Sequence, residues 1–250
     1  MAALLLRPLS QAMQLGDRVY QLIRDQIVKG SIEPGTRLRV DAIAQQLGIS
    51  STPVRDALNR LERDGLISKH PYQGATVRVF KESEISDLYE LRAGLECLAV
   101  RLACLRITEE ECAWLRRHQA LGKAALTEGD MEAYRVYNQD YHSAILKAAR
   151  NAQLTLVMES VLLQLQMLTA QTIRVAGRPE RAIEEHGQII DLIAQRKTVE
   201  AVKLMEHHIM SALRDALVQL KQVSELQDGN NTTTRLHSNH LPKRAKRLLR

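Results

Sequence analysis

The chain has 250 residues, of which 45% are hydrophobic and 3% aromatic, and its formal net charge is +6. No apolar run approaches the roughly 18 residues of a membrane span, and the leucine-rich start is too short for a secretory signal, so we expect a cytoplasmic protein without a membrane segment. The three cysteines form no CxxC pair and no even framework. This excludes a disulfide scaffold and fits free thiols in a reducing compartment.

The charge is unevenly distributed along the chain. Residues 1–80 carry a net +4, residues 81–227 a net −3 and residues 228–250 a net +5. A basic first third on a mildly acidic body is typical of a nucleic-acid-binding module joined to a domain of another kind. We expect residues 1–13 to be a flexible arm and residues 228–250 a basic disordered tail.

The first third predicts three short helices followed by a hairpin. Residues 17–29 place apolar side chains at helical offsets, and residues 41–67 read as two helices joined by a tight turn. Asp41 is the expected N-cap of the second helix, and Gly48 is placed to end that helix in the left-handed conformation. After the turn at residues 70–74, Ala75–Val79 alternates apolar and polar residues like a strand. The pattern predicts a winged helix-turn-helix over residues 14–80, with an ordinary helical hairpin as the plainer alternative.

The rest of the chain predicts helices alone. The segments are 82–106, 109–127, 130–149, 152–175, 180–195 and 198–227, and a Thr108-x-x-Glu111 capping box opens the second of them. No βαβ pattern, Gly-rich phosphate loop or catalytic triad is evident, so an enzyme is not expected. The expected fold class is mainly α, with an all-α helical bundle over residues 81–227.

Histidines are the informative residues of this bundle. Asn138 and His142 are four residues apart and share one helix face, while His186 and His208 lie on two later helices. Three histidines and an oxygen ligand drawn from three helices could enclose a divalent metal. Taken singly, each histidine is more often an ordinary core or surface residue.

Several spaced motifs of the first third resemble the winged-helix domain of the GntR family of bacterial transcription regulators. They are VYQLIRDQIVKGSIEPGTRL, LGISSTPVRDALNRLERDGLI and PYQGATV. The resemblance implies a DNA-binding module that contacts DNA through Ser50, Ser51, Thr52, Arg55, Gln73 and Gly74. Many members of the family carry arginine where this chain has Ser51, which implies a different operator preference.

The chemistry of these residues agrees with such a role. Hydroxyls and the free amides at a helix N-terminus bind phosphates, and Arg55 can donate two hydrogen bonds to a guanine edge in the major groove. A glycine at Gly74 lets the wing backbone approach the sugar-phosphate chain closely. The alternative for Arg55 is a salt bridge to a nearby carboxylate such as Asp56 or Glu62.

The helical body resembles the effector domain of the FadR-type subfamily, the FCD domain. The matching stretches are ESEISDLYELRAGLECLAVRLA, NQDYHSAILKAARNAQL, GRPERAIEEHGQIIDLI and VEAVKLMEHHIMSAL. The resemblance implies a divalent metal, zinc with nickel as the alternative, held by Asn138, His142, His186 and His208. The family's carboxylate is an amide here, which is a weaker, neutral ligand, and Asp140 points to another side of the helix. The alternative is a polar pocket whose histidines bind effector or water directly.

Arg92 is the expected effector-binding residue. In similar domains an arginine at this position meets the carboxylate of the effector, which suits the two-pronged hydrogen bonding of a guanidinium. The alternative is an ion pair with Glu96, four residues along the same helix.

Together these features predict a regulator of transcription that binds a palindromic operator as a homodimer, with repression favoured. Its operator binding would respond to a small anionic effector with a carboxylate, through a shift in the placement of the two domains about residues 78–84. One alternative is a metal-dependent hydrolase in which the three histidines activate water. Another is a constitutive DNA-binding protein with a vestigial pocket.

Overall fold

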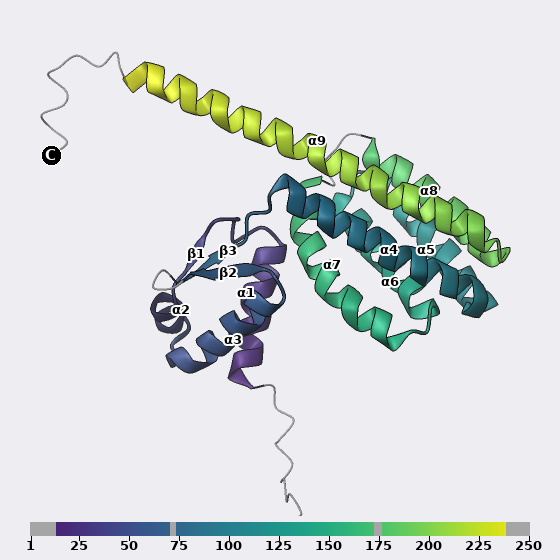
Figure 1. The fold of residues 1–250 in the computed structure, drawn as a ribbon, viewed down its shortest axis with the longest axis horizontal. Helices are drawn as coiled ribbons and strands as arrows, with labels where there is room; N and C mark the ends of the chain where they lie inside the picture. The colour runs from purple at the N-terminus through teal and green to yellow at the C-terminus, as the bar shows by residue number, and fades with distance from the viewer. Residues whose placement is uncertain (1–13, 71–73, 173–176, 239–250) are drawn as a thin grey trace, which may run out of the picture. The chain divides into compact units, whose positions relative to one another are not determined.

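The computed structural model describes residues 14–70, 74–172 and 177–238. Within these ranges the chain forms nine helices and one three-stranded sheet (Figure 1), which confirms the mainly α fold class. The contacts divide the chain into two units. The first joins the residues up to Phe80 with Glu159–Ala170, and the second contains the remainder.

The first unit is a winged helix-turn-helix. Its helices are α1 (Leu15–Val28), α2 (Val40–Leu47) and α3 (Ser51–Arg63), and its strands are β1 (Arg37–Leu38), β2 (Ile67–His70) and β3 (Gly74–Val77). The strands are antiparallel in the order β1-β3-β2, and Thr76 of β3 faces Arg37 on one side and Ser68 on the other. The sequence did not predict β1, since two residues are too few to show an alternating pattern.

Apolar side chains of α1 and α3 form the core of this unit. Val54, Ala57, Leu58 and Leu61 of α3 are all buried and recur at helical spacing. Gly48 ends α2 with φ 66°, as predicted. The N-cap prediction at Asp41 is wrong, because the N-cap of α2 is Arg39, two residues earlier, and Asp41 lies in the first turn of the helix. There Asp41 forms an ion pair with Arg39 at 2.9 Å.

The remaining helices follow in chain order. They are α4 (Glu82–Arg106), α5 (Glu109–Glu128), α6 (Met131–Ala148), α7 (Ala152–Thr172), α8 (Arg178–Ala194) and α9 (Thr198–Ser238). The capping box at α5 is confirmed: Glu111 N–H donates to Thr108 Oγ1 at 3.2 Å, and Thr108 N–H donates to the Glu111 carboxylate at 2.9 Å. Helix α9 continues past residue 227 to Ser238, into the segment expected to be a disordered tail. Each residue added to an existing helix gains a hydrogen bond without a new nucleation step, so a helix can extend beyond its packed part.

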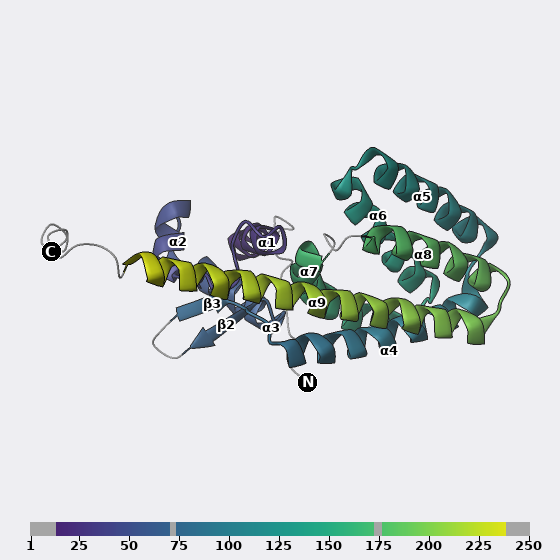
Figure 2. The same ribbon diagram turned by 90° about the horizontal axis from the view of Figure 1, so that it is seen from above.

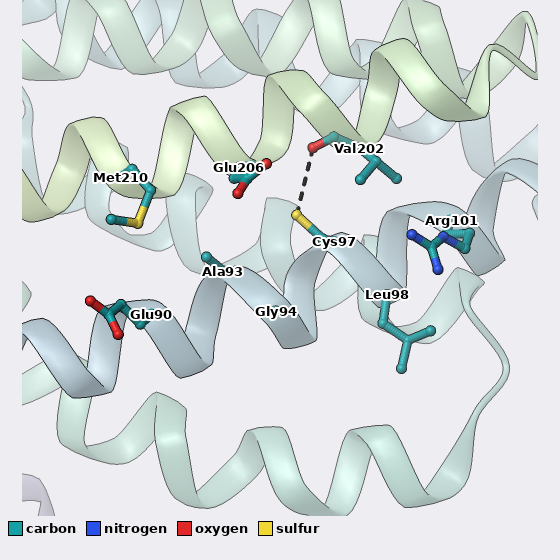
Figure 3. Close-up of a pocket in the computed structure, with 9 residues that line it drawn as sticks. All are labelled: Glu90, Ala93, Gly94, Cys97, Leu98, Arg101, Val202, Glu206 and Met210. Carbon is teal, nitrogen blue, oxygen red and sulfur yellow. Dashed lines mark hydrogen bonds between the residues drawn. The ribbon is translucent and has the colours of Figure 1, made fainter.

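Helices α4 and α9 lie side by side along much of α4, as both views show (Figures 1 and 2). In this contact the thiol of Cys97 on α4 donates to the backbone oxygen of Val202 on α9 at 3.6 Å (Figure 3). None of the described helices is long and apolar enough to cross a membrane. This second unit brings α4, α6, α8 and α9 together around the histidines.

Candidate functional site

The N-terminal end of α3 presents four of the residues expected to contact DNA. Ser50 is the N-cap, with extended backbone (φ −71°, ψ 163°) and no hydrogen bond from its side chain to the helix. Ser51 and Thr52 follow in the first turn, and all three side chains are exposed. The first turn carries no acidic residue. The positive end of the helix dipole and the hydroxyls are therefore open to an anion such as a phosphate.

Arg55 is exposed and forms no ion pair or hydrogen bond with any residue that the structure describes. The alternative partner Glu62 instead pairs with Lys69 at 3.1 Å. On the same helix Arg60 pairs with Asp17 and lies over an aromatic ring of α1. The guanidinium of Arg55 is therefore available to a partner molecule, whereas that of Arg60 is used within the fold.

The wing contributes Gly74, which opens β3 with φ +84°. This is a left-handed backbone conformation that residues with a side chain rarely adopt, so glycine is favoured here because it has no Cβ atom. Gln73 lies outside the residues that the structure describes.

Three histidines predicted to bind metal come together in the second unit. His142 of α6, His186 of α8 and His208 of α9 are buried, and one ring nitrogen from each lies within 4.8 Å of those of the other two. The Nε2 atoms of His186 and His208 are 3.2 Å apart. Tyr141 stacks on the ring of His186 with a centroid separation of 3.8 Å.

The other ring nitrogen of each histidine is held by a hydrogen-bonding partner. His142 Nδ1 lies 2.5 Å from Glu96 Oε2, and His208 Nδ1 lies 2.6 Å from Glu185 Oε2. A carboxylate accepts only, so each of these Nδ1 atoms is the donor and each Nε2 keeps its lone pair. In the third histidine, Nδ1 is 3.0 Å from the hydroxyl of Tyr137. Histidines that bind metals characteristically donate their second nitrogen to such partners.

Arg92 lies within this cluster and also forms the ion pair that was its alternative role. Its Nε donates to Glu96 Oε1 at 2.6 Å, and its Nη2 lies 3.2 Å from His142 Nε2. The guanidinium therefore points at the atom that would bind a metal or an effector. Asn138, one turn before His142 on α6, is half-buried and makes no hydrogen bond to any described residue.

Burial keeps the three imidazoles neutral. It lowers the pKa of His208 to about 4, although the hydrogen bond to Glu185 opposes this. Burial also lowers the pKa of His186. It lowers the pKa of His142 as well, although the carboxylate of Glu96 favours the protonated form of that histidine. For Glu96, burial would raise the pKa, but His142 and Arg92 together lower it below its ordinary value. The cluster thus offers neutral imidazoles backed by ionised carboxylates, the state in which histidine binds metal.

These residues fit a divalent metal. Two nitrogens bound to one tetrahedral zinc at about 2.0–2.1 Å each are about 3.3 Å apart, close to the 3.2 Å between His186 and His208. The hydroxyl of Tyr141 is buried beside the histidines with no hydrogen-bond partner among the described residues. An unsatisfied buried hydroxyl suggests a missing polar ligand.

Sequence reasoning missed part of this cluster. The sequence indicates Glu96 only as a partner of Arg92, and it predicts no role in the cluster for Glu185 or Arg178. Arg178 is buried, donates to the backbone oxygen of His208 at 3.2 Å and lies 3.3 Å from Glu185. The one local signal was the position of Glu185 immediately before His186. The pairing of Glu96 with His142 joins residues 46 positions apart and leaves no local pattern.

Comparisons with known proteins agree with both resemblances. Residues 15–77 match the family model "Bacterial regulatory proteins, gntR family", and residues 87–211 match the FCD domain. The Nta operon transcriptional regulator of Aminobacter aminovorans is 31% identical over 81% of this chain and 95% of its own length. The HTH-type transcriptional repressor RspR of Escherichia coli is 21% identical over 86% of this chain and 93% of its own. The solved structure of E. coli McbR/YncC covers 85% of this chain with a TM-score of 0.67 at 23% identity, which supports the fold. These proteins are regulators of transcription and not enzymes, so the hydrolase alternative gains no support.

Proposed function

We propose that this chain, which belongs to the GntR family of bacterial regulatory proteins and carries an FCD domain, is a cytoplasmic repressor whose operator binding responds to a small carboxylate effector. The observation that carries the proposal is the buried cluster of His142, His186 and His208 beside Arg92. The named repressor among its relatives supports repression as the sign of control.

DNA reading is assigned to the first unit. Ser50, Ser51 and Thr52 hold phosphates at the N-terminus of α3, and Arg55 reads a guanine edge in the major groove. Gln73 and Gly74 of the wing contact the sugar-phosphate backbone. Two copies of the chain bind a palindromic operator, because the two-fold symmetry of a dimer matches that of a repeated half-site.

Effector sensing is assigned to the second unit. The three histidines hold zinc, or nickel, and the amide oxygen of Asn138 supplies a neutral fourth ligand. When bound, the metal supplies a positive centre that attracts a carboxylate. Arg92 donates to the same carboxylate through the guanidinium edge that faces His142.

The charges of the cluster favour an anionic effector. Buried Arg92 pairs with Glu96, and buried Arg178 pairs with Glu185, so the cationic and anionic side chains balance with the histidines neutral. A divalent ion adds positive charge that these side chains do not neutralise. Uncompensated buried charge is unfavourable, so a carboxylate ligand is favoured when metal is present.

Effector binding controls DNA by changing the relative populations of domain placements. Residues 78–84 join the DNA-binding unit to the effector-binding unit in the chain. A ligand shifts an equilibrium between two conformations only if it binds one of them more tightly than the other. An effector that binds preferentially to an arrangement unable to span both half-sites releases the operator.

Operator selection from random DNA with the purified full chain tests the first half of the proposal. We expect recovery of a two-fold symmetric sequence that the protein binds at least 10³-fold more tightly than unrelated DNA at physiological salt. Native mass spectrometry of the same preparation, followed by denaturation, tests the second half through the metal and small acid that co-purify. Equal affinity for all DNA sequences would contradict sequence-specific DNA binding. A preparation that takes up neither metal nor small acid would contradict effector binding.

A further inference from the structure

Three tyrosines follow one another on the buried side of α6. Tyr134, Tyr137 and Tyr141 are 2%, 2% and 0% exposed. Their spacing of three and four residues places them on one face of the helix. A buried tyrosine usually has a hydrogen-bond partner for its hydroxyl. The partners of the three hydroxyls therefore indicate what each side chain does.

The first two hydroxyls are used within the fold. Tyr134 donates to the backbone oxygen of Pro179 at 3.3 Å. The hydroxyl of Tyr137 lies 3.0 Å from His186 Nδ1. Pro179 and His186 both belong to α8, so each of these contacts holds α6 against that helix.

The hydroxyl of Tyr141 differs, because it is buried and has no hydrogen-bond partner in the described part of the chain. One other buried side-chain atom there shares this condition, His118 Nε2, and it lies 3.5 Å from a carboxylate oxygen of Asp140. An unpaired buried hydroxyl is unfavourable, whereas phenylalanine would bury the same ring without that cost. A hydroxyl at this position is therefore explained best by a bound molecule that pairs with it.

The ring of Tyr141 lies directly against two of the histidines proposed to bind metal. It stacks on His186, with ring centroids 3.8 Å apart and planes 17° apart. The ring of His142 is nearly perpendicular to it, with centroids 5.1 Å apart. The unpaired hydroxyl thus belongs to the surroundings of the proposed metal and effector.

A second donor at the cluster loses an acceptor when a metal binds. Arg92 Nη2 lies 3.2 Å from His142 Nε2, whose lone pair is free because Nδ1 donates to Glu96. That lone pair is no longer available once His142 holds a metal, so Nη2 needs another acceptor. The loaded site then presents two buried donors to a ligand, one cationic and one neutral.

We propose that the hydroxyl of Tyr141 donates a hydrogen bond to a carboxylate oxygen of the effector, alongside Arg92. The inference rests on the effector sensing of the proposed function and adds a residue that determines which ligands bind. A carboxylate accepts through two oxygens with about four lone pairs, so one such group satisfies both donors. A ligand that pairs the buried hydroxyl is favoured over one that leaves it unpaired.

Tyr141→Phe tests this role, because it keeps the stacked ring and removes only the hydroxyl. Calorimetric titration of the zinc-loaded full chain with a panel of small mono-, di- and tricarboxylates measures the affinity for each acid. For the acids that bind wild type, we expect Tyr141→Phe to lower affinity about tenfold or more, as for a hydrogen bond to a charged group. Zinc affinity and the urea stability of the ligand-free protein should not fall.

Tyr134→Phe is the matched control on the same helix. It removes a hydroxyl that is paired within the fold, so it should lower urea stability and leave the affinity for the acids unchanged. The two variants should therefore show opposite patterns of stability and ligand affinity.

Four results would overturn the proposal. Acid affinity that Tyr141→Phe retains in full would remove the role of the hydroxyl and leave effector sensing intact. A fall in zinc affinity would make the hydroxyl a ligand of the metal instead. A loss of stability in the ligand-free variant would show that the hydroxyl is paired within the protein. A wild-type chain that binds none of the acids would overturn effector sensing together with this inference.

Discussion

Two arginines on α3 illustrate how neighbouring residues of one type divide between structure and recognition. Arg60 pairs with Asp17 and lies 4.2 Å from the ring centroid of Tyr20. Arg55, five residues earlier, is exposed and has no ion pair within the described residues. Helical spacing turns Arg60 toward α1 and leaves Arg55 on the outer surface.

Replacing Arg55 by alanine should relax operator specificity. Loss of a two-pronged contact to guanine costs about 1–3 kcal/mol of discrimination, while affinity for unrelated DNA should change little. Fluorescence anisotropy with operator and scrambled duplexes at fixed salt measures both quantities. Arg63→Ala, in the last turn of α3, is the control. An equal loss on both duplexes would mean that Arg55 contacts only phosphate.

Glu96 should set the metal affinity of the cluster although it is not proposed as a ligand. Glu96→Gln removes the charge that accepts from His142 Nδ1 and pairs with Arg92. Loss of such a supporting partner typically weakens metal binding 10–100-fold, measurable by zinc competition with a chromophoric chelator. Glu184→Gln, an exposed carboxylate of α8, should leave zinc affinity unchanged. Equal zinc affinity in both variants would contradict the role of Glu96, and His186→Ala should abolish the site altogether.

At the scale of elements, the packing of α5 against α6 positions a tyrosine that contacts the histidine cluster. A Cβ atom at Gly122 of α5 would lie 2.5 Å from the ring of Tyr137. The hydroxyl of the same tyrosine contacts His186 Nδ1 at 3.0 Å. The absence of a side chain at Gly122 therefore lets Tyr137 reach the histidine.

Gly122→Ala should destabilise the protein despite the better helix propensity of alanine. Overpacking typically costs about 1–3 kcal/mol, against a gain of about 1 kcal/mol from propensity. Urea unfolding followed by circular dichroism should give a net loss, and zinc affinity should fall as Tyr137 shifts. Ala124→Leu, at an exposed position on the same helix, is the control. Unchanged stability and zinc affinity would show that Tyr137 can move without consequence.

Local chemistry predicts some helix ends correctly but not all, since the N-cap of α2 is Arg39 and not Asp41. Gly48 and the Thr108–Glu111 capping box delimit their helices as predicted. A short element that depends on a distant interaction leaves no local pattern: the two-residue strand β1 forms through its pairing with β3. Likewise, the histidines could be selected through a family resemblance, but their carboxylate partners could not, because packing between separate helices creates those pairs. The DNA-contacting and metal-binding assignments and the domain boundaries stay predictions.

At the scale of the whole molecule, the buried histidines should make the metal-free protein sensitive to acid. The pKa of His208 is about 4 in the folded state against an ordinary value of 6.5, so the unfolded chain binds the proton more readily. Stability is then complete above about pH 6.5 and falls as the pH drops toward 4. The expected slope is about 1.4 kcal/mol per pH unit for each such group.

Urea denaturation of chelator-treated protein between pH 7.5 and 4.5 measures this dependence. His208→Gln should reduce the slope, while replacement of the adjacent exposed His207 by Gln should not. Identical slopes for wild type and His208→Gln would contradict the assignment.

The operator affinity of one preparation under four conditions tests most directly whether the histidine cluster controls DNA binding, as proposed. Anisotropy titrations compare chelated and zinc-loaded protein, each with and without a panel of small mono-, di- and tricarboxylates. We predict that at least one acid changes operator affinity tenfold or more in zinc-loaded wild type, and that the response is lost in chelated protein and in His186→Ala. An operator affinity that stays the same under all four conditions, or a response that His186→Ala retains in full, would contradict the account.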